Sequence, residues 1–224
     1  MRRPYIAALL LAPLVGLAAA TLPVRASAQS TQENAAADRS LVDPSVVARA
    51  VASLNASRTM VARFVQRGQN GAVWTGRMWV SRPGKLRFQY DPPEEDVIWS
   101  SGGLVKHYDA ELDSVTHVPP DMTPAWFLLD DDVRITDEVH LLATAERGDR
   151  FFVTATQSGA FSDGRVTLAF EGAPARLLGW TTTEADGTLT QVDLVDLVVG
   201  QDIPEKVFDY KPPSPDFPGG RSDR

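Results

Sequence analysis

Apolar residues recur at helical spacing in one early segment of the chain. Asp43 followed by Pro44 is typical of a helix start, since Asp caps free backbone N–H groups and Pro suits the first turn. The apolar positions that follow are spaced by one, three or four residues: Val46, Val47, Ala50, Val51 and Leu54. This spacing predicts one amphipathic helix whose apolar face packs against another part of the fold.

After Ser57 the pattern changes to alternating apolar and polar residues, the period of a β-strand. Residues typical of turns, such as Gly102 with Gly103 and Asp186 with Gly187, separate the alternating segments. We expect about eleven strands, near residues 60–65, 74–81, 85–90, 96–100, 104–108, 114–118, 136–144, 151–157, 165–171, 176–184 and 189–199. Many short strands joined by hairpins favour an antiparallel barrel or sandwich.

Between two of these strands, Thr123 and Pro124 predict the start of a second, short helix that runs to Leu129. Residues 126–129 are four large apolar residues in a row, more than one face of a short helix can bury. The chain shows no internal repeat and no linker rich in Pro, Gly or Ser. We therefore expect one domain over residues 43–217, after a flexible segment at 29–42 and before a disordered tail at 218–224.

The first 28 residues have the three parts of a cleavable signal peptide. Arg2 and Arg3 form a basic start, residues 6–22 are apolar and uncharged, and residues 26–28 read Ala-Ser-Ala, a cleavage-site pattern. The alternative is a membrane anchor, which the interrupting Pro13 and Gly16 disfavour. We expect export, with a mature chain that begins near residue 29.

Composition narrows the class of function. The whole chain has a net charge of −7, and loss of the first 28 residues leaves 19 basic against 29 acidic residues, a net charge of −10. An acidic protein is a poor general binder of nucleic acid. The chain has no cysteine, so it has no disulfides, and it lacks the cysteine that carries the acyl chains of an anchored bacterial lipoprotein.

No catalytic or metal-binding pattern is apparent. The three histidines, His107, His117 and His140, are not paired at helical spacing, and no nucleophile elbow or phosphate-binding loop occurs. Two acidic clusters, at residues 94–96 and 130–132, could be carboxylate pairs or calcium loops, but solvated loops are the simpler interpretation. We expect no metal, no cofactor and no enzymatic activity.

The most informative stretch is residues 62–109. It contains F-x-Q at residues 64–66, G-x-M-W-V-x-R-P at residues 76–83, the aromatic strand at 86–90, and a Pro-Pro turn followed by acids. This ordered set resembles the LolA family of periplasmic outer-membrane lipoprotein carriers. Thr123, Pro124 and the following apolar helix match the family's lid, and Phe208 with Pro212 and Pro213 match its terminal strand. Ser101-Gly102-Gly103 replaces the family's S-D-G turn.

The resemblance implies a single-domain, half-open antiparallel β-barrel covered by an α-helical lid. It also implies a periplasmic carrier whose hydrophobic cavity holds the acyl chains of lipoproteins. The implied donor is an inner-membrane ABC transporter complex, and the implied acceptor is an outer-membrane lipoprotein receptor. We expect a monomer. The alternatives are that receptor, which the missing cysteine disfavours, and a related half-barrel protein, enzyme or binding protein, for another lipid or hydrophobic small molecule.

Arg82 is the residue to which the resemblance gives a specific role, as a latch that ties the lid in the closed form. Its place at a predicted strand end suits this role, because a guanidinium there can reach a helix C-terminus and donate to several carbonyls. An exposed strand-end Arg is the alternative. Candidates for the lipid cavity or lid, some of which are expected to be ordinary core, are Val47, Val51, Leu54, Trp74, Met78, Leu86, Phe88, Trp99, Trp126, Phe127 and Leu129.

Overall fold

The computed structural model describes residues 41–158 and 164–213. The predicted signal peptide at residues 1–28 and the predicted tail at 218–224 lie outside the described residues, as does most of the segment at 29–42. Among the described residues, no helix is long and apolar enough to cross a bilayer.

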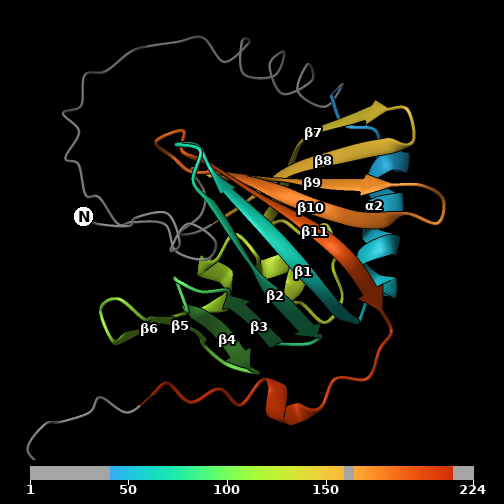
Figure 1. Ribbon diagram of the computed structural model, residues 1–224. Helices are drawn as coiled ribbons and strands as arrows, with labels where there is room; N and C mark the ends of the chain where they lie inside the picture. Colours follow the sequence, from blue (N-terminus) through green and yellow to red (C-terminus); the bar gives the residue numbers. More distant parts are fainter. Residues whose placement is uncertain (1–40, 159–163, 214–224) are drawn as a thin grey trace, which may run out of the picture.

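The protein is built on one antiparallel sheet of eleven strands, in the order β6-β5-β4-β3-β2-β1-β11-β10-β9-β8-β7. The sheet is open, because β6 and β7 form its two ends (Figure 1). The predicted number of strands and the incomplete barrel are thus confirmed. The strands are β1 Thr59–Gly68, β2 Val73–Ser81, β3 Lys85–Tyr90, β4 Val97–Ser101, β5 Val105–Asp109, β6 Ser114–Val118, β7 Val139–Arg147, β8 Arg150–Gln157, β9 Arg165–Glu171, β10 Arg176–Thr183 and β11 Leu189–Val199.

The predicted N-terminal helix is α2, Pro44–Ala56. Asp43 caps it, accepting a hydrogen bond from the backbone N–H of Ser45 at 2.8 Å, and Pro44 occupies the first turn, as the sequence indicates. The helix lies against the β8 and β10 half of the sheet. There the Ser53 hydroxyl donates to the carbonyl of Ala175 at 2.8 Å, and the Arg49 guanidinium lies 4.2 Å from the ring centre of Phe151.

The central strands bury alternate residues on the face that α2 covers. In β2, Trp74, Gly76, Met78 and Val80 are buried and their neighbours are exposed or half-buried. Gly76 is required there by close packing: a Cβ atom would meet the carbonyl oxygen of Gln89 at 2.3 Å and the ring of Phe64 at 2.6 Å. The glycine of the G-x-M-W-V-x-R-P motif therefore has a structural reason.

The opposite face of β4 and β5 carries a second, smaller cluster, formed by Val97, Trp99 and Tyr108. The chain after β11 covers it: Tyr210 packs its ring 5.0 Å from that of Trp99, and Arg87 donates to the carbonyl of Val207 at 3.1 Å. Within described residues 200–213 only the 3-10 helix η4, Glu205–Val207, is regular. The prediction of a terminal strand is therefore wrong. Residues 200–213 pack across the sheet through their side chains and do not pair with a strand.

Candidate functional site: the sheet interior and its lid

The segment between β6 and β7 closes the interior of the curved sheet, and we call residues 120–133 the lid segment. It contains two 3-10 helices, η2 Pro120–Met122 and η3 Trp126–Leu128. The buried Thr123 joins them, its hydroxyl donating to the carbonyl of Pro120 at 3.0 Å. The predicted short helix therefore exists but is a 3-10 helix, which corrects the expected α-helical lid.

Every large side chain in the 3-10 helix η3 and at its C-cap is buried. Trp126, Phe127, Leu128 and Leu129 are at most 6% exposed. A helix that is apolar on all sides is stable only where other parts of the fold surround it. The segment lies within the curve of the sheet, so it is surrounded by apolar side chains on several sides.

A row of aromatic rings connects the lid segment with the middle of the sheet. Phe127 lies 5.6 Å from Trp180 of β10, and Trp180 lies 6.3 Å from Phe88 of β3. Phe88 in turn lies 5.5 Å from Phe64 of β1. All four side chains are at most 2% exposed. The lid segment thus supplies aromatic groups that fill the interior.

Most of the predicted cavity and lid residues meet in this interior. One core cluster contains Leu54, Trp74, Met78, Leu86, Phe88, Trp126, Phe127 and Leu129. Val47 is buried outside that cluster, and Val51 is only half-buried. Trp99 lies on the opposite face, in the cluster under Tyr210. Residues 97–100 of β4 are all buried, so its sequence has no alternation from which the facing of Trp99 could be read.

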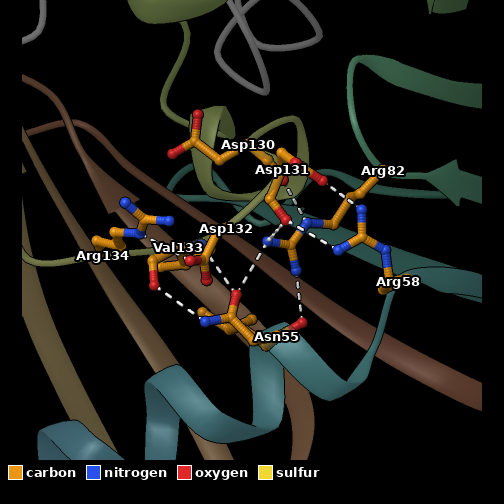
Figure 2. Close-up of polar contacts among 9 residues, drawn as sticks. Asn55, Arg58, Arg82, Asp130, Asp131, Asp132, Val133 and Arg134 are labelled. Carbon is orange, nitrogen blue, oxygen red and sulfur yellow. Dashed lines mark hydrogen bonds and ion pairs between the residues drawn. The ribbon is translucent and has the colours of Figure 1, made fainter.

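Arg82 lies between the end of α2 and the lid segment (Figure 2). Its guanidinium donates to the carbonyl of Leu54, in the last turn of α2. It also donates to the carbonyl of Asp130 at 2.6 Å and to that of Asp131 at 3.3 Å. The side chain therefore joins the helix, the lid segment and the end of β2 through backbone carbonyls, and it is only 5% exposed.

Burial of the Arg82 guanidinium costs free energy, because the charged group loses its hydration. Burial lowers the pKa of its guanidinium and the nearby Arg58 lowers it further, while the carboxylates of residues 130–132 act in the opposite direction. Its hydrogen bonds compensate for the lost hydration, together with the negative end of the α2 dipole. Asp130 has the complementary perturbation, since desolvation raises the pKa of its carboxyl and Arg82 opposes the rise.

Asn55 is a member of this site that the sequence analysis did not single out. Its side-chain amide donates to the carbonyl of Val133 at 3.1 Å and accepts from the N–H of the same residue at 2.9 Å. Arg82 also donates to its Oδ1, at 3.2 Å. Asn55 thus ties the end of the lid segment to α2 much as a neighbouring strand would. A lone Asn near a helix C-terminus gives no sequence signal for such a contact.

Two further contacts join the lid segment to residues that flank strands of the sheet. The backbone N–H of Gly84, beyond the end of β2, donates to the carbonyl of Leu129 at 2.8 Å. The exposed Arg58 forms an ion pair with Asp131. The fold and the site together define the class of protein: an incomplete antiparallel β-barrel whose apolar interior is closed by a lid held through polar contacts.

Comparisons with known proteins agree with this class. The family model described as outer membrane lipoprotein carrier protein LolA matches residues 55–211. The chain therefore belongs to the LolA family. An outer-membrane lipoprotein carrier protein of Legionella pneumophila (strain Corby) is 30% identical over 168 residues, 71% of this chain and 82% of the relative. One of Methylococcus capsulatus is 30% identical over 177 residues, 72% and 81% of the two chains.

Solved structures are similar at lower identity. The crystal structure of a LolA superfamily protein from Nitrosomonas europaea has 13% identity and a TM-score of 0.45, and the match covers 74% of this chain and 96% of that chain. An uncharacterized conserved protein from Thermus thermophilus has 12% identity and a TM-score of 0.47, over 75% and 93% of the two chains.

Proposed function

We propose that this protein is a periplasmic carrier, and not an enzyme, that binds the acyl chains of lipoproteins between the sheet and the lid segment. In this proposal it takes lipoproteins from an inner-membrane ABC transporter complex and delivers them to an outer-membrane lipoprotein receptor. Its membership in a family of lipoprotein carriers supports the general role. The observation that carries the proposal is the lid segment itself, whose apolar side chains fill the interior of an open sheet.

In the proposed mechanism, acyl chains replace the lid side chains in the interior. Fully burying a Trp, Phe or Leu side chain stabilises a protein by about 1.5–3 kcal/mol, so exposing residues 126–129 costs on the order of 6–12 kcal/mol. An acyl chain of about 15 methylene groups gains about 12 kcal/mol on leaving water, at about 0.8 kcal/mol per group. The two terms are similar in size, so cargo and lid can exchange without a large net cost.

Arg82 serves in this proposal as the latch of the closed form. Its partners are carbonyl groups of α2 and of the lid segment, which water can satisfy when the lid opens. The latch is therefore reversible, whereas the apolar interior supplies most of the free energy that favours closure. This division lets cargo compete for the interior while the closed state keeps one defined geometry.

The carrier role is tested by release of a radiolabelled lipoprotein from inner-membrane spheroplasts. The purified mature protein is expected to bring the lipoprotein into the supernatant in a form that an outer-membrane receptor accepts. Mass spectrometry of acyl-bearing molecules that co-purify with the protein identifies other cargo. Absence of lipoprotein release, together with a co-purifying free lipid, would reject the lipoprotein role in favour of another lipid.

The latch is tested by Arg82→Leu, with Arg87→Leu as the matched control. Arg87 of β3 is half-buried and, like Arg82, donates to a backbone carbonyl, but it lies on the opposite face, under Tyr210. Arg82→Leu is expected to impair transfer to the receptor, and Arg87→Leu to leave transfer unchanged per folded molecule. Unchanged transfer by Arg82→Leu would show that the latch role is wrong.

A further inference from the structure

An acidic cleft of about 690 Å³ lies outside the apolar interior, between the lid segment and the first residues of β7. Its volume is in the range of ligand-binding pockets. Five carboxylates and one basic residue line it, together with five uncharged residues: Asp121, Asp130, Asp131, Asp132, Glu138, Arg134, Pro120, Trp126, Thr136, Val139 and Gln157. The cleft is therefore suited to a cationic ligand.

Part of this negative charge is already compensated. Asp132 pairs with Arg134 at 2.7 Å, and Asp131 pairs with Arg58. Among the described residues, the carboxylates of Asp121, Asp130 and Glu138 form no ion pair within 4.0 Å. The positive charge of Arg82, which does not line the cleft, opposes part of the charge of Asp130, but the five carboxylates still outnumber Arg58, Arg82 and Arg134.

Two buried polar groups in the wall of the cleft lack a hydrogen-bond partner within the described part of the chain. They are the indole Nε1–H of Trp126, a donor, and the side-chain oxygen Oε1 of Gln157, an acceptor. The two residues are 6% and 8% exposed. Buried polar groups are nearly always satisfied in native proteins, so both groups call for a partner outside the described residues. Neither atom has appreciable accessible surface in this structure, so a ligand in the cleft reaches them only after the two side chains rotate. A ligand that pairs with both groups must offer an acceptor and a donor.

The cleft lies beside the edge of a strand, and this position restricts the class of ligand further. Val139 and Gln157 are cross-strand partners at the beginning of the β7–β8 pair, and β7 is the last strand of the sheet. An extended peptide laid at this edge would offer carbonyl and N–H groups at strand spacing. A metal ion is disfavoured, because no group of three or more His, Asp or Glu side chains in the described residues has metal-binding geometry.

We propose that the acidic cleft binds a basic side chain, Lys or Arg, carried on an extended peptide segment of a protein partner. Asp130 and Glu138 attract the cation, and the peptide backbone pairs with Trp126 and Gln157 after their side chains rotate toward the cleft. The site is separate from the acyl-chain interior, although Trp126 borders both. Because Trp126 belongs to the lid segment, a peptide bound in the cleft would contact the lid segment directly.

The test is calorimetric titration of the mature protein at low ionic strength with two blocked pentapeptides, one with two lysines among alanines and one with two glutamates. The lysine peptide is expected to bind at least about tenfold more tightly than the glutamate peptide. In a parallel nuclear magnetic resonance titration, the indole N–H resonance of Trp126 is expected to shift with the lysine peptide only. Spermidine, which has charge but no peptide group, is expected to bind more weakly and to leave this resonance in place.

Variants make the assignment specific. The double variant Asp130→Asn/Glu138→Gln is expected to lower affinity for the lysine peptide about fivefold to tenfold, since each partly exposed charge pair contributes modestly. Asp149→Asn/Asp202→Asn makes the same change in net charge at two exposed carboxylates outside the cleft, and it should change affinity less than about twofold.

Three results would each overturn the proposal: no binding of the lysine peptide, an equal loss of affinity in both double variants, or an unchanged chemical shift of the Trp126 indole N–H at saturating lysine peptide. If spermidine bound as tightly as the lysine peptide and caused the same shift, the cleft would bind any cation without recognising a peptide. That result would also overturn the proposal. None of the probes has an acyl chain, so failure here leaves the carrier proposal untouched.

Discussion

Replacing Arg82 with leucine should release the lid segment while leaving the sheet folded. The substitution keeps an apolar stem of similar bulk but removes the donors to the carbonyls of Leu54, Asp130 and Asp131. It also removes the hydrogen bond to Asn55. The strand pairs of β2 with β1 and β3 are made by the backbone and are expected to persist.

The size of the effect follows from the contacts and the burial of the guanidinium. A hydrogen bond to a charged group contributes about 1.5–3 kcal/mol net, but such terms do not add within one network. Burial of Arg82, which lowers its pKa, offsets part of the gain. We expect a loss of about 2–4 kcal/mol from the closed state, which raises the population of lid-open molecules roughly 30-fold to 700-fold.

Amide hydrogen exchange reads this change at single residues. The amide of Gly84 donates to the carbonyl of Leu129, and the amide of Val133 donates to Asn55, so both report on the lid segment. Both are expected to exchange faster by about the factor given above. Amides of the β8–β9 pair, which lies away from the lid contacts of Arg82, serve as internal controls and should keep their protection.

Two companion variants separate the latch from a general loss of stability. Arg82→Lys keeps the charge with a compact ammonium that cannot span the helix and the lid segment together, so its effect should be intermediate. Asn55→Ala removes both bonds to Val133 and should accelerate exchange mainly at that amide, at a cost of roughly 1–3 kcal/mol. If Arg82→Leu accelerates Gly84 and Val133 no more than the β8–β9 amides, the local latch is refuted.

Three further predictions concern other parts of the fold. Trp99→Leu and Phe88→Leu should each lower the free energy of unfolding, measured by urea denaturation, by roughly 2–4 kcal/mol. Only Phe88→Leu should weaken lipoprotein transfer, because Trp99 lies on the opposite face of the sheet. Equal transfer defects in the two variants would contradict this prediction. Gly76→Ala should cost roughly 3 kcal/mol or more, whereas Gly103→Ala, whose Cβ meets nothing within 4 Å, should be nearly neutral; a neutral Gly76→Ala would contradict the packing argument. Burial raises the pKa of Tyr90 well above its usual value, so its neutral form contributes stability that is complete below about pH 10 and is lost as pH rises beyond it. Tyr90→Phe should therefore flatten the decline of the melting temperature at alkaline pH, and an unchanged decline would exclude Tyr90 as its source.

Local patterns in the sequence indicated the long helix and the strands of the described residues, but not the 3-10 form of the lid segment or the irregular chain after β11. Asp43 and Pro44 mark the start of α2 because capping is a contact between residues close in the chain. Alternation, or for β4 the turn residues beside it, indicates the eleven strands, because most neighbouring strands are joined by short local hairpins. The sequence also indicated that Arg82 lies at a strand end, from which its guanidinium can reach a helix C-terminus.

Only the tertiary structure decided which of these features meet. The facing of Trp99 depends on the chain after β11, which covers one side of β4 from more than 100 residues away. Asn55 and Val133 are 78 residues apart, and nothing in their identities indicates that one holds the other. The apolar run of the lid segment indicates a short helix, but the structure decided that this helix is 3-10 and buried on all sides. Sequence thus determined what is local and periodic, while packing between distant segments decided the interior, the partners of Arg82 and the acidic cleft.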